Sequence, residues 1–178
     1  MKVLLICGSP RNGNTQAMLE KVAEGAKEGG AETEMVLLRK LDIKHCIGCK
    51  SETGECSIPD DMQKLYPKLL EADVLVFGTP AYYDNVTGIF KDFMDRTNIF
   101  YKEKKWEGKP FAILTVGGME IGEGSIERCE EIMKNFTALH RMKLMGSVLA
   151  SAFKAREIEK DEGKMKECME LGKKLANL

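Results

Sequence analysis

Short apolar runs alternate along the chain with stretches in which apolar residues recur at helical spacing. Five of the runs have the length and composition of buried β-strands, namely residues 3–7, 34–38, 74–77, 112–116 and 145–151. Helical spacing follows each run, in residues 15–28, after Pro59, after Gly88, from Ser125 and in residues 164–178. This alternation predicts an α/β fold with a doubly wound, five-stranded parallel sheet and helices on both faces.

Local signals refine the boundaries of these helices. Asp60 and Asp61 follow Pro59 and place acidic side chains in the predicted first turn of the second helix. Pro67 lies inside the same helical pattern and is expected to kink or split it. Ser125 is expected to cap the start of the fourth helix.

Length and charge narrow the class of protein. The 178 residues suit a single domain, 1–178, with an inserted cysteine-containing loop at about residues 39–58. The net charge of −1 comes from 27 basic and 28 acidic residues mixed along the chain, which argues against nucleic acid or an anionic membrane as a partner. The chain starts without the zones of a signal peptide and contains no apolar run of membrane-spanning length, so we expect a cytoplasmic protein.

The polar, glycine-rich stretch Gly8–Thr15 joins the first strand to the first helix. Such a loop brings backbone N–H groups and the positive end of a helix to one point, where an anion can bind. Asn14 stands where a P-loop has its lysine, and the stretch lacks the G-x-G-x-x-G pattern. A single terminal phosphate, as on FMN, therefore fits better than a triphosphate or a pyrophosphate, and an ordinary strand-to-helix turn is the alternative.

Individual residues of this first loop suit a phosphate in different ways. The hydroxyl groups of Ser9 and Thr15 and the backbone amides of residues 12–14 can donate to a dianion. Arg11 either adds a permanently charged donor or is an ordinary surface residue.

Two further loops follow the third and fourth predicted strands. The second loop, after the third strand, offers a flat apolar wall and backbone polar groups suited to an isoalloxazine ring, through Pro80, Ala81, Tyr82, Tyr83 and Asn85. One tyrosine could instead pack on the next helix, and Asn85 could cap it. The third loop, after the fourth strand, begins with Gly117 and Gly118, where a planar ligand could approach the backbone closely. Because parallel strands end at one edge of a sheet, all three loops should meet there.

The remaining chemistry lies in the cysteines. Three of the six form a C-x2-C-x6-C set in the inserted loop, Cys46, Cys49 and Cys56. They are either ordinary or redox-sensitive thiols in a structural loop, or ligands of a metal or cluster, for which three thiolates and the adjacent His45 make an incomplete set. The other three fall in predicted strands and helices and suit a core: Cys7, Cys129 and Cys168. His45 and His140 lack the sequence context of a zinc hydrolase or a serine triad, so the sequence offers no apparatus for hydrolysis. No side chain is assigned as catalytic, because FMN would carry the chemistry.

Three stretches together resemble the flavodoxin-like NADPH-dependent FMN reductases, close to their iron-sulfur flavoprotein branch. They are residues 2–15, Cys46-Ile47-Gly48-Cys49 leading to Asp60-Asp61-Met62, and residues 78–83 with Lys91 and Asp95-Arg96 beyond. The resemblance covers about residues 1–150. It implies a flavodoxin-like sheet of order 2-1-3-4-5, tightly bound FMN, and homodimers or homotetramers in which a neighbouring subunit helps to close the flavin site.

The resemblance also assigns roles to residues. It places phosphate binding on Ser9, Arg11, Asn12, Asn14 and Thr15, ring contacts on Pro80, Ala81, Tyr82, Tyr83 and Asn85, and flanking positions on Gly117 and Gly118. The iron-sulfur branch looks like C-x2-C-x2-C with a fourth cysteine nearby. Here Glu52 stands at the third position, so the chain looks more like a cluster-less relative.

The expected function is an FMN-dependent NAD(P)H oxidoreductase that passes electrons from NADPH or NADH through FMN to a quinone, a flavin or another acceptor. The chemistry would be carried by the cofactor, with the protein positioning the ring and controlling water access. The alternative is a flavoprotein electron carrier, with or without an iron-sulfur cluster, that exchanges electrons with protein partners. The balanced charge disfavours a carrier, since such proteins usually present an acidic surface.

Overall fold

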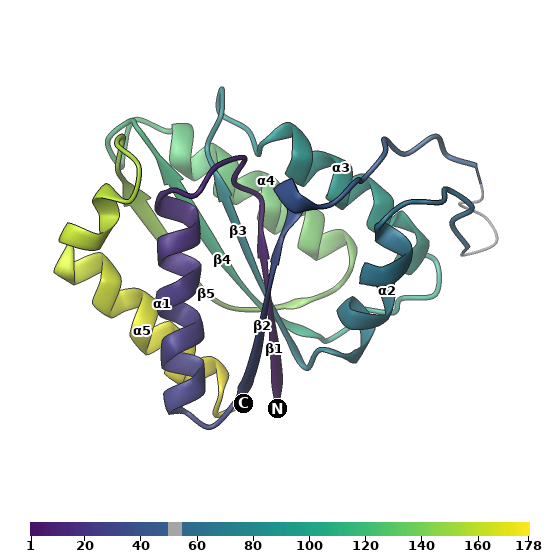
Figure 1. Ribbon diagram of the computed structural model, residues 1–178, viewed down its shortest axis with the longest axis horizontal. Helices are drawn as coiled ribbons and strands as arrows, with labels where there is room; N and C mark the ends of the chain where they lie inside the picture. The colour runs from purple at the N-terminus through teal and green to yellow at the C-terminus, as the bar shows by residue number, and fades with distance from the viewer. Residues whose placement is uncertain (50–54) are drawn as a thin grey trace.

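A five-stranded parallel sheet runs through the centre of the structure in the order β2-β1-β3-β4-β5 (Figure 1). The computed structural model describes residues 1–49 and 55–178. The strands are β1 (Lys2–Cys7), β2 (Glu32–Leu37), β3 (Val74–Pro80), β4 (Pro110–Gly117) and β5 (Lys143–Ser151). The predicted parallel sheet and its strand order are thus confirmed.

Helices cover both faces of the sheet. One face carries α1 (Asn14–Glu28) and α5 (Glu162–Leu175), and the other carries α2 (Met62–Glu71), α3 (Gly88–Arg96) and α4 (Ser125–Leu139) (Figure 1). Short 3₁₀ turns lie at Leu38–Lys40, Thr97–Phe100 and Glu157–Lys160. A separate apolar cluster fills the space on each side of the sheet, so the near-continuous apolar character of β1, β3 and β4 follows from burial on both faces.

The second helix departs from the sequence-based expectation at its start. It begins at Met62, so Asp60 and Asp61 lie before its first turn rather than in it. Asp60 still serves the helix start, because its Oδ1 accepts a hydrogen bond of 3.0 Å from the backbone N–H of Met62. The helix also continues through Pro67 to Glu71, so of the two expected effects of this proline, a kink or a split, the split does not occur.

The start of α4 also differs from the prediction. Ser125 is its first helical residue, and the capping position is Gly124, which has a φ of 91° and makes no side-chain cap. The left-handed backbone at Gly124 turns the chain into the helix, a conformation that glycine adopts without strain. Glu127 then accepts a hydrogen bond of 2.5 Å from the backbone N–H of Gly122.

Two glycines allow α1 and α5 to touch through their backbones. A Cβ at Gly172 would lie 2.1 Å from the carbonyl oxygen of Val22, and a Cβ at Gly25 would lie 2.1 Å from that of Met169. Neither distance is compatible with a side chain. The contact fixes α5 against the helix whose first turn follows the Gly8–Thr15 loop.

On the other face, aromatic rings form the centre of the core. The Phe77 ring on β3 lies 6.2 to 6.3 Å from five neighbouring rings, those of Phe90, Phe93, Trp106, Phe111 and Phe136. His140 extends this cluster, with ring centroids 4.9 Å from Trp106 and 5.0 Å from Phe136. Its Nδ1 has no hydrogen-bond partner in the described part of the chain.

The buried imidazole of His140 predicts a loss of stability in mild acid. Burial lowers the pKa of His140 to about 4, while an unfolded histidine titrates near pH 6.5. Between these values the unfolded chain binds a proton that the folded chain does not, so the free energy of unfolding should fall as the pH drops from about 6.5 to about 4. Denaturant unfolding across this range should show a shallower fall for His140→Phe than for the wild type.

His45 provides the matched control for this pH experiment. Its Nδ1 lies 2.6 Å from Oδ1 of Asp92, and that hydrogen bond raises the pKa of His45. A raised pKa contributes stability below about pH 6.5 that is lost at higher pH, the opposite sign to His140. Equal acid profiles for the wild type and His140→Phe would contradict the expectation.

Candidate functional site

A cavity of about 350 Å³ lies at the carboxyl ends of the strands, where the three predicted loops meet. Its lining combines small, apolar and polar side chains: Ser9, Arg11, Asn14, Thr15, Pro80, Ala81, Tyr82, Val116, Gly117, Gly118, Ala152 and Phe153. The structure therefore brings together nine of the thirteen residues expected at a cofactor site. The other four lie outside the cavity wall: Asn12, Gly13, Tyr83 and Asn85.

The first loop offers an uncapped helix end beside two buried hydroxyl groups. Ser9 and Thr15 are buried, and the Ser9 hydroxyl donates a hydrogen bond of 2.8 Å to the carbonyl oxygen of Arg11. Gly13 precedes α1 in an extended conformation, and no side chain caps the helix there. The N–H groups of the first turn are thus left for an anion, and the helix dipole favours negative charge at this point.

Asn14 lines the cavity, yet its side chain is hydrogen-bonded to the segment that follows β5. Its Nδ2 donates to the carbonyl oxygens of Ala152 at 3.2 Å and Lys154 at 2.9 Å. Its Oδ1 accepts a hydrogen bond of 3.2 Å from the backbone N–H of Ile158. The side-chain amide therefore uses both of its N–H groups within the protein.

The neighbouring Asn12 takes part in a charged network outside the cavity. Its Oδ1 accepts a hydrogen bond of 2.9 Å from Arg156, which also pairs with Glu20 and Glu159. Arg156 has a φ of 58°, a left-handed conformation that is strained for a bulky residue. The network ties the first loop and α1 to the turn after β5.

The second loop forms a tight hairpin beyond Pro80. Tyr82 and Asn85 exchange two backbone hydrogen bonds, of 2.8 and 3.1 Å, around Tyr83 and Asp84. Both central residues have positive φ, 49° and 62°, as a two-residue hairpin turn of this type requires. Tyr83 is fully exposed at the tip and does not pack on the following helix, whereas Tyr82 is 44% exposed and lines the cavity.

Asn85 does not cap α3. Its Oδ1 accepts a hydrogen bond of 2.8 Å from the backbone N–H of Val86, and the capping residue is Thr87, whose hydroxyl oxygen accepts from Phe90 at 3.3 Å. The Thr87 hydroxyl also donates a hydrogen bond of 2.6 Å to the carbonyl oxygen of Gly8. Thr87 thereby connects the first and second loops.

In the third loop, glycines allow close packing at the cavity wall. A Cβ at Gly117 would lie 2.9 Å from Ile126 and 3.5 Å from Ala81, and one at Gly118 would lie 2.8 Å from the Phe153 ring. The need for small residues here follows from packing within the chain. Close approach of a ligand, as expected from the sequence, remains a prediction.

The fourth side of the cavity is formed by residues that sequence reasoning missed. Ala152 and Phe153 directly follow β5 and lack the polar, glycine-rich composition that marked the other loops. The available signal was topological, because β5 ends at the same edge of the sheet as β1, β3 and β4.

The cysteine loop lies beside α3, against a buried ion pair. Arg96 and Asp60 pair with both side chains fully buried, and Arg96 also donates to the carbonyl oxygen of Lys44 at 2.9 Å and to Sγ of Cys56 at 3.2 Å. Cys46 and Cys49 are exposed. Glu52, which stands at the remaining position of the cysteine motif, lies outside the described residues.

The described residues around these cysteines do not form a metal site. Within residues 1–49 and 55–178, no group of three or more His, Cys, Asp or Glu side chains is arranged to hold a metal ion. Burial raises the pKa of Cys129 and of Cys168 to about 12, and Cys7 is also buried, so all three are core residues as expected.

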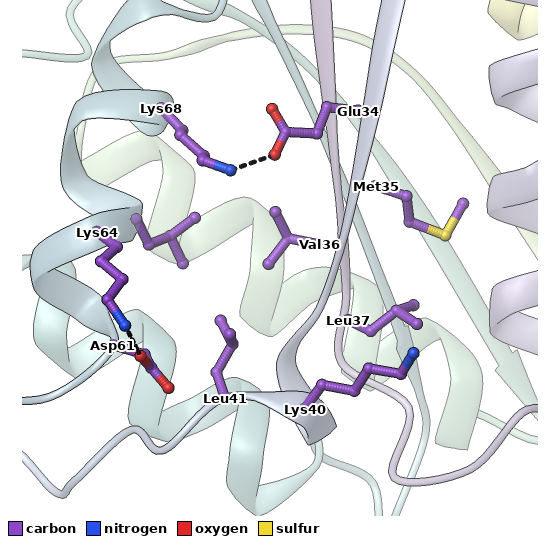
Figure 2. Close-up of a pocket in the computed structure, with 10 residues that line it drawn as sticks. Glu34, Met35, Val36, Leu37, Lys40, Leu41, Asp61, Lys64 and Lys68 are labelled. Atoms are coloured by element: carbon purple, nitrogen blue, oxygen red, sulfur yellow. Dashed lines mark hydrogen bonds and ion pairs between the residues drawn. The ribbon is translucent and has the colours of Figure 1, made fainter.

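A second hollow lies between the edge strand β2 and α2, away from the three loops (Figure 2). Val36, Leu37 and Leu41 form part of its wall. At its rim Lys68 pairs with Glu34 at 2.5 Å and Lys64 with Asp61 at 2.9 Å (Figure 2). Two of its three lysines pair with its two carboxylates, and none of its lining residues belongs to the three loops predicted to bind FMN.

Several known proteins are similar to this chain. A family model described as NADPH-dependent FMN reductase matches residues 1–156. An iron-sulfur flavoprotein of Archaeoglobus fulgidus is 46% identical over 124 residues, which are 68% of this chain and 62% of that protein. An iron-sulfur flavoprotein of Methanocaldococcus jannaschii is 33% identical over 149 residues, 82% of this chain and 76% of that protein.

The fold is likewise shared with solved structures. A flavone reductase superposes with a TM-score of 0.79 at 24% identity, over 99% of this chain and 62% of that protein. The chain thus spans less than two thirds of this reductase, and its match spans less than two thirds of the Archaeoglobus protein.

Proposed function

Because the chain belongs to the NADPH-dependent FMN reductase family, we propose that it is an oxidoreductase that binds FMN and passes electrons from NADPH or NADH to a quinone, a flavin or another acceptor. The observation that carries the proposal is the cavity at the carboxyl ends of β1, β3 and β4, which joins an uncapped helix end to an apolar wall. This is the pairing of surfaces that a phosphate attached to a flat ring requires.

The residues of the cavity fit FMN in two parts. Thr15, the first-turn amides of α1 and Arg11 would hold the phosphate, and Arg11 is the one charged side chain among the described lining residues. Ser9 would join them by exchanging the hydrogen bond from its hydroxyl to the carbonyl oxygen of Arg11 for one to the phosphate. Pro80, Ala81, Tyr82, Gly117 and Gly118 would line the ring. The four expected residues outside the cavity wall would contact FMN through their backbone groups or from a neighbouring subunit: Asn12, Gly13, Tyr83 and Asn85.

Bound FMN would supply the redox chemistry, as an acceptor of a hydride from a reduced nicotinamide and a donor to a second substrate. The protein's own contribution would be to orient the ring and to exclude water, through the apolar wall around Ala81 and Val116. The described part of the cavity wall has no His, Asp, Glu, Lys or Cys, so the proposal assigns no side chain as an acid or a base.

The proposal includes one domain over residues 1–178, with the cysteine loop at 39–58 as an insertion. The single sheet and the backbone contact between α1 and α5 support it.

The proposal also includes a homodimer or homotetramer, since apolar side chains stand exposed on the loops around the cavity: Tyr82, Tyr83, Met119 and Ile121. No helix in the described ranges is long and apolar enough to cross a membrane.

A second candidate function is a flavoprotein that exchanges electrons with protein partners. The names of the two archaeal relatives favour it, and so does the cysteine set Cys46, Cys49 and Cys56. The net charge of −1 argues against it, because a carrier usually relies on a strongly charged docking surface.

Rapid mixing of the FMN-loaded protein with NADPH or NADH, without oxygen, separates the two functions. We expect the visible absorbance of bound flavin to bleach much faster than that of FMN in the same buffer without protein, because the cavity orients the ring. If a protein donor reduces the bound flavin but neither NADPH nor NADH does, the reductase proposal is wrong. An assay for iron and acid-labile sulfide after anaerobic purification tests the iron-sulfur variant of the carrier.

A further inference from the structure

The segment that follows β5 is held in place by the first loop. Asn14 donates to the carbonyl oxygens of Ala152 and Lys154, on either side of Phe153. Arg11 donates to the carbonyl oxygen of Phe153 itself at 3.2 Å. Glu157 accepts from the backbone N–H groups of Phe153 at 2.9 Å and Lys154 at 2.8 Å. Both backbone polar groups of Phe153 are therefore bonded to side chains, and the backbone N–H of Ala152 donates to the carbonyl oxygen of Gly117 at 2.8 Å.

The side chain carried by this fixed backbone is exposed. Phe153 is 78% exposed, yet it lines the cavity and its ring lies against Gly118 of the third loop. Its backbone is bonded to the first loop, so the side chain extends from the phosphate end of the cavity toward the loop expected beside the ring. A single exposed phenylalanine is unremarkable on a protein surface, but one with a clamped backbone at a cavity mouth is positioned for a ligand.

The hydrogen bonds of Asn14 limit what its side chain can do for a phosphate. Both N–H groups of the amide donate to backbone carbonyls, and its oxygen faces the N–H of Ile158. The amide orientation is fixed by these partners, since a backbone N–H can donate only to the oxygen. No side-chain donor of Asn14 is left over for an anion.

We propose that Phe153 is a ring-binding residue that contacts the isoalloxazine of FMN, and that Asn14 is a positioning residue that acts through Ala152–Lys154. The inference rests on the proposed function, in which this cavity takes FMN. A phenyl ring offers a flat apolar face and no hydrogen-bond donor, which suits the ring of the cofactor and not its phosphate.

Dissociation constants for FMN and for riboflavin, which lacks the phosphate, test this assignment. Flavin fluorescence gives both values without turnover. Phe153→Ala and Asn14→Ala should each weaken the binding of both ligands by a similar factor, on the order of 10-fold. Thr15→Val, which removes a proposed phosphate donor, should weaken FMN and leave riboflavin unchanged. Asn14→Ala combined with Phe153→Ala should be little worse than either alone, because both changes act on one contact.

Controls separate a local effect from unfolding. Leu139→Ala truncates another exposed apolar side chain, at the end of α4 outside the cavity wall, and should leave both dissociation constants unchanged. Phe153→Tyr keeps the flat ring and should retain the wild-type values. Thermal unfolding shows whether Asn14→Ala binds flavin more weakly because it has lost its fold. If it has, Phe153→Ala still tests the inference, because the side chain that it truncates is exposed.

Two results would overturn the inference. One is an Asn14→Ala protein that loses affinity for FMN but not for riboflavin, which would make Asn14 a phosphate ligand. The other is a Phe153→Ala protein that binds both flavins like the wild type. A wild-type protein that binds neither flavin would instead refute the proposed function, and with it the premise of this inference.

Discussion

Replacing Asp60 with alanine is expected to lower the free energy of unfolding by about 3–5 kcal/mol. The side chains of Asp60 and Arg96 are both fully buried, and the carboxylate accepts from Nη1 and Nη2 of the same guanidinium, the latter at 3.0 Å. Removal of the carboxylate leaves a buried cation with no partner of opposite charge. Urea unfolding followed by circular dichroism measures the change.

The same ion pair has consequences for the cysteine loop. Arg96 holds the carbonyl oxygen of Lys44 and the sulfur of Cys56, and Asp60 accepts a hydrogen bond of 2.9 Å from the backbone N–H of Lys44. Loss of Asp60 should therefore also expose the loop, seen as faster reaction of Cys56 with a thiol reagent. Replacing both partners, in Asp60→Leu with Arg96→Met, should recover much of the lost stability, because no charge is then left buried.

Asp95→Ala is the matched control for Asp60→Ala. Asp95 pairs with Lys91 at 2.6 Å on the surface of α3, with both side chains about half exposed. Its loss should change the free energy of unfolding by less than about 1 kcal/mol. Similar values for the two alanine variants would contradict the importance assigned to the buried pair.

Replacing Gly172 with alanine is expected to destabilise the protein by about 3 kcal/mol, although alanine is the better helix former. The new Cβ would lie 2.1 Å from the carbonyl oxygen of Val22 and 2.8 Å from the backbone nitrogen of Ala26. Both contacts are with helix backbone, which cannot rotate away, so α5 has to move off α1. Thermal or denaturant unfolding measures the loss.

Gly88→Ala controls for the intrinsic effect of the substitution. Gly88 is the first residue of α3, and a Cβ there would meet no atom within 4 Å. This variant should be neutral or more stable, by about 0.5 kcal/mol. A Gly172→Ala protein that is also neutral or more stable would contradict the prediction, because α5 would then move off α1 without a loss of stability. FMN binding by Gly172→Ala should weaken as well, since α1 provides the proposed phosphate site.

The sequence predicted the parts of this molecule whose signal is local. A buried parallel strand is a short apolar run, and an amphipathic helix repeats its apolar residues every three or four positions, so the five strands and most helix positions could be assigned. The loop residues Ser9, Thr15 and Ala81 could be proposed together because parallel strands end at one edge of a sheet. That rule needs only the order of the elements.

Single-residue boundaries were less certain. Ser125 was expected to cap α4, but a left-handed Gly124 precedes the helix instead. The sequence allowed Asn85 either to contact the flavin ring or to cap α3. In the structure its side chain instead accepts a hydrogen bond from Val86 within its own loop. Several conformations compete at such positions, and neighbouring elements decide among them.

The sequence by itself determined the fold class and three of the four sides of the cavity, and its resemblance to a known family implied the order of the strands. Tertiary structure decided the rest: the bonding of Asn14 to a segment 138 residues away, the pairing of Asp60 with Arg96 and the contact between Gly25 and Met169. Each of these joins residues on elements far apart in the chain. The distance between such residues depends on how closely the helices and loops pack on the sheet. The hydrophobic periodicity of one element contains no information about its separation from another element.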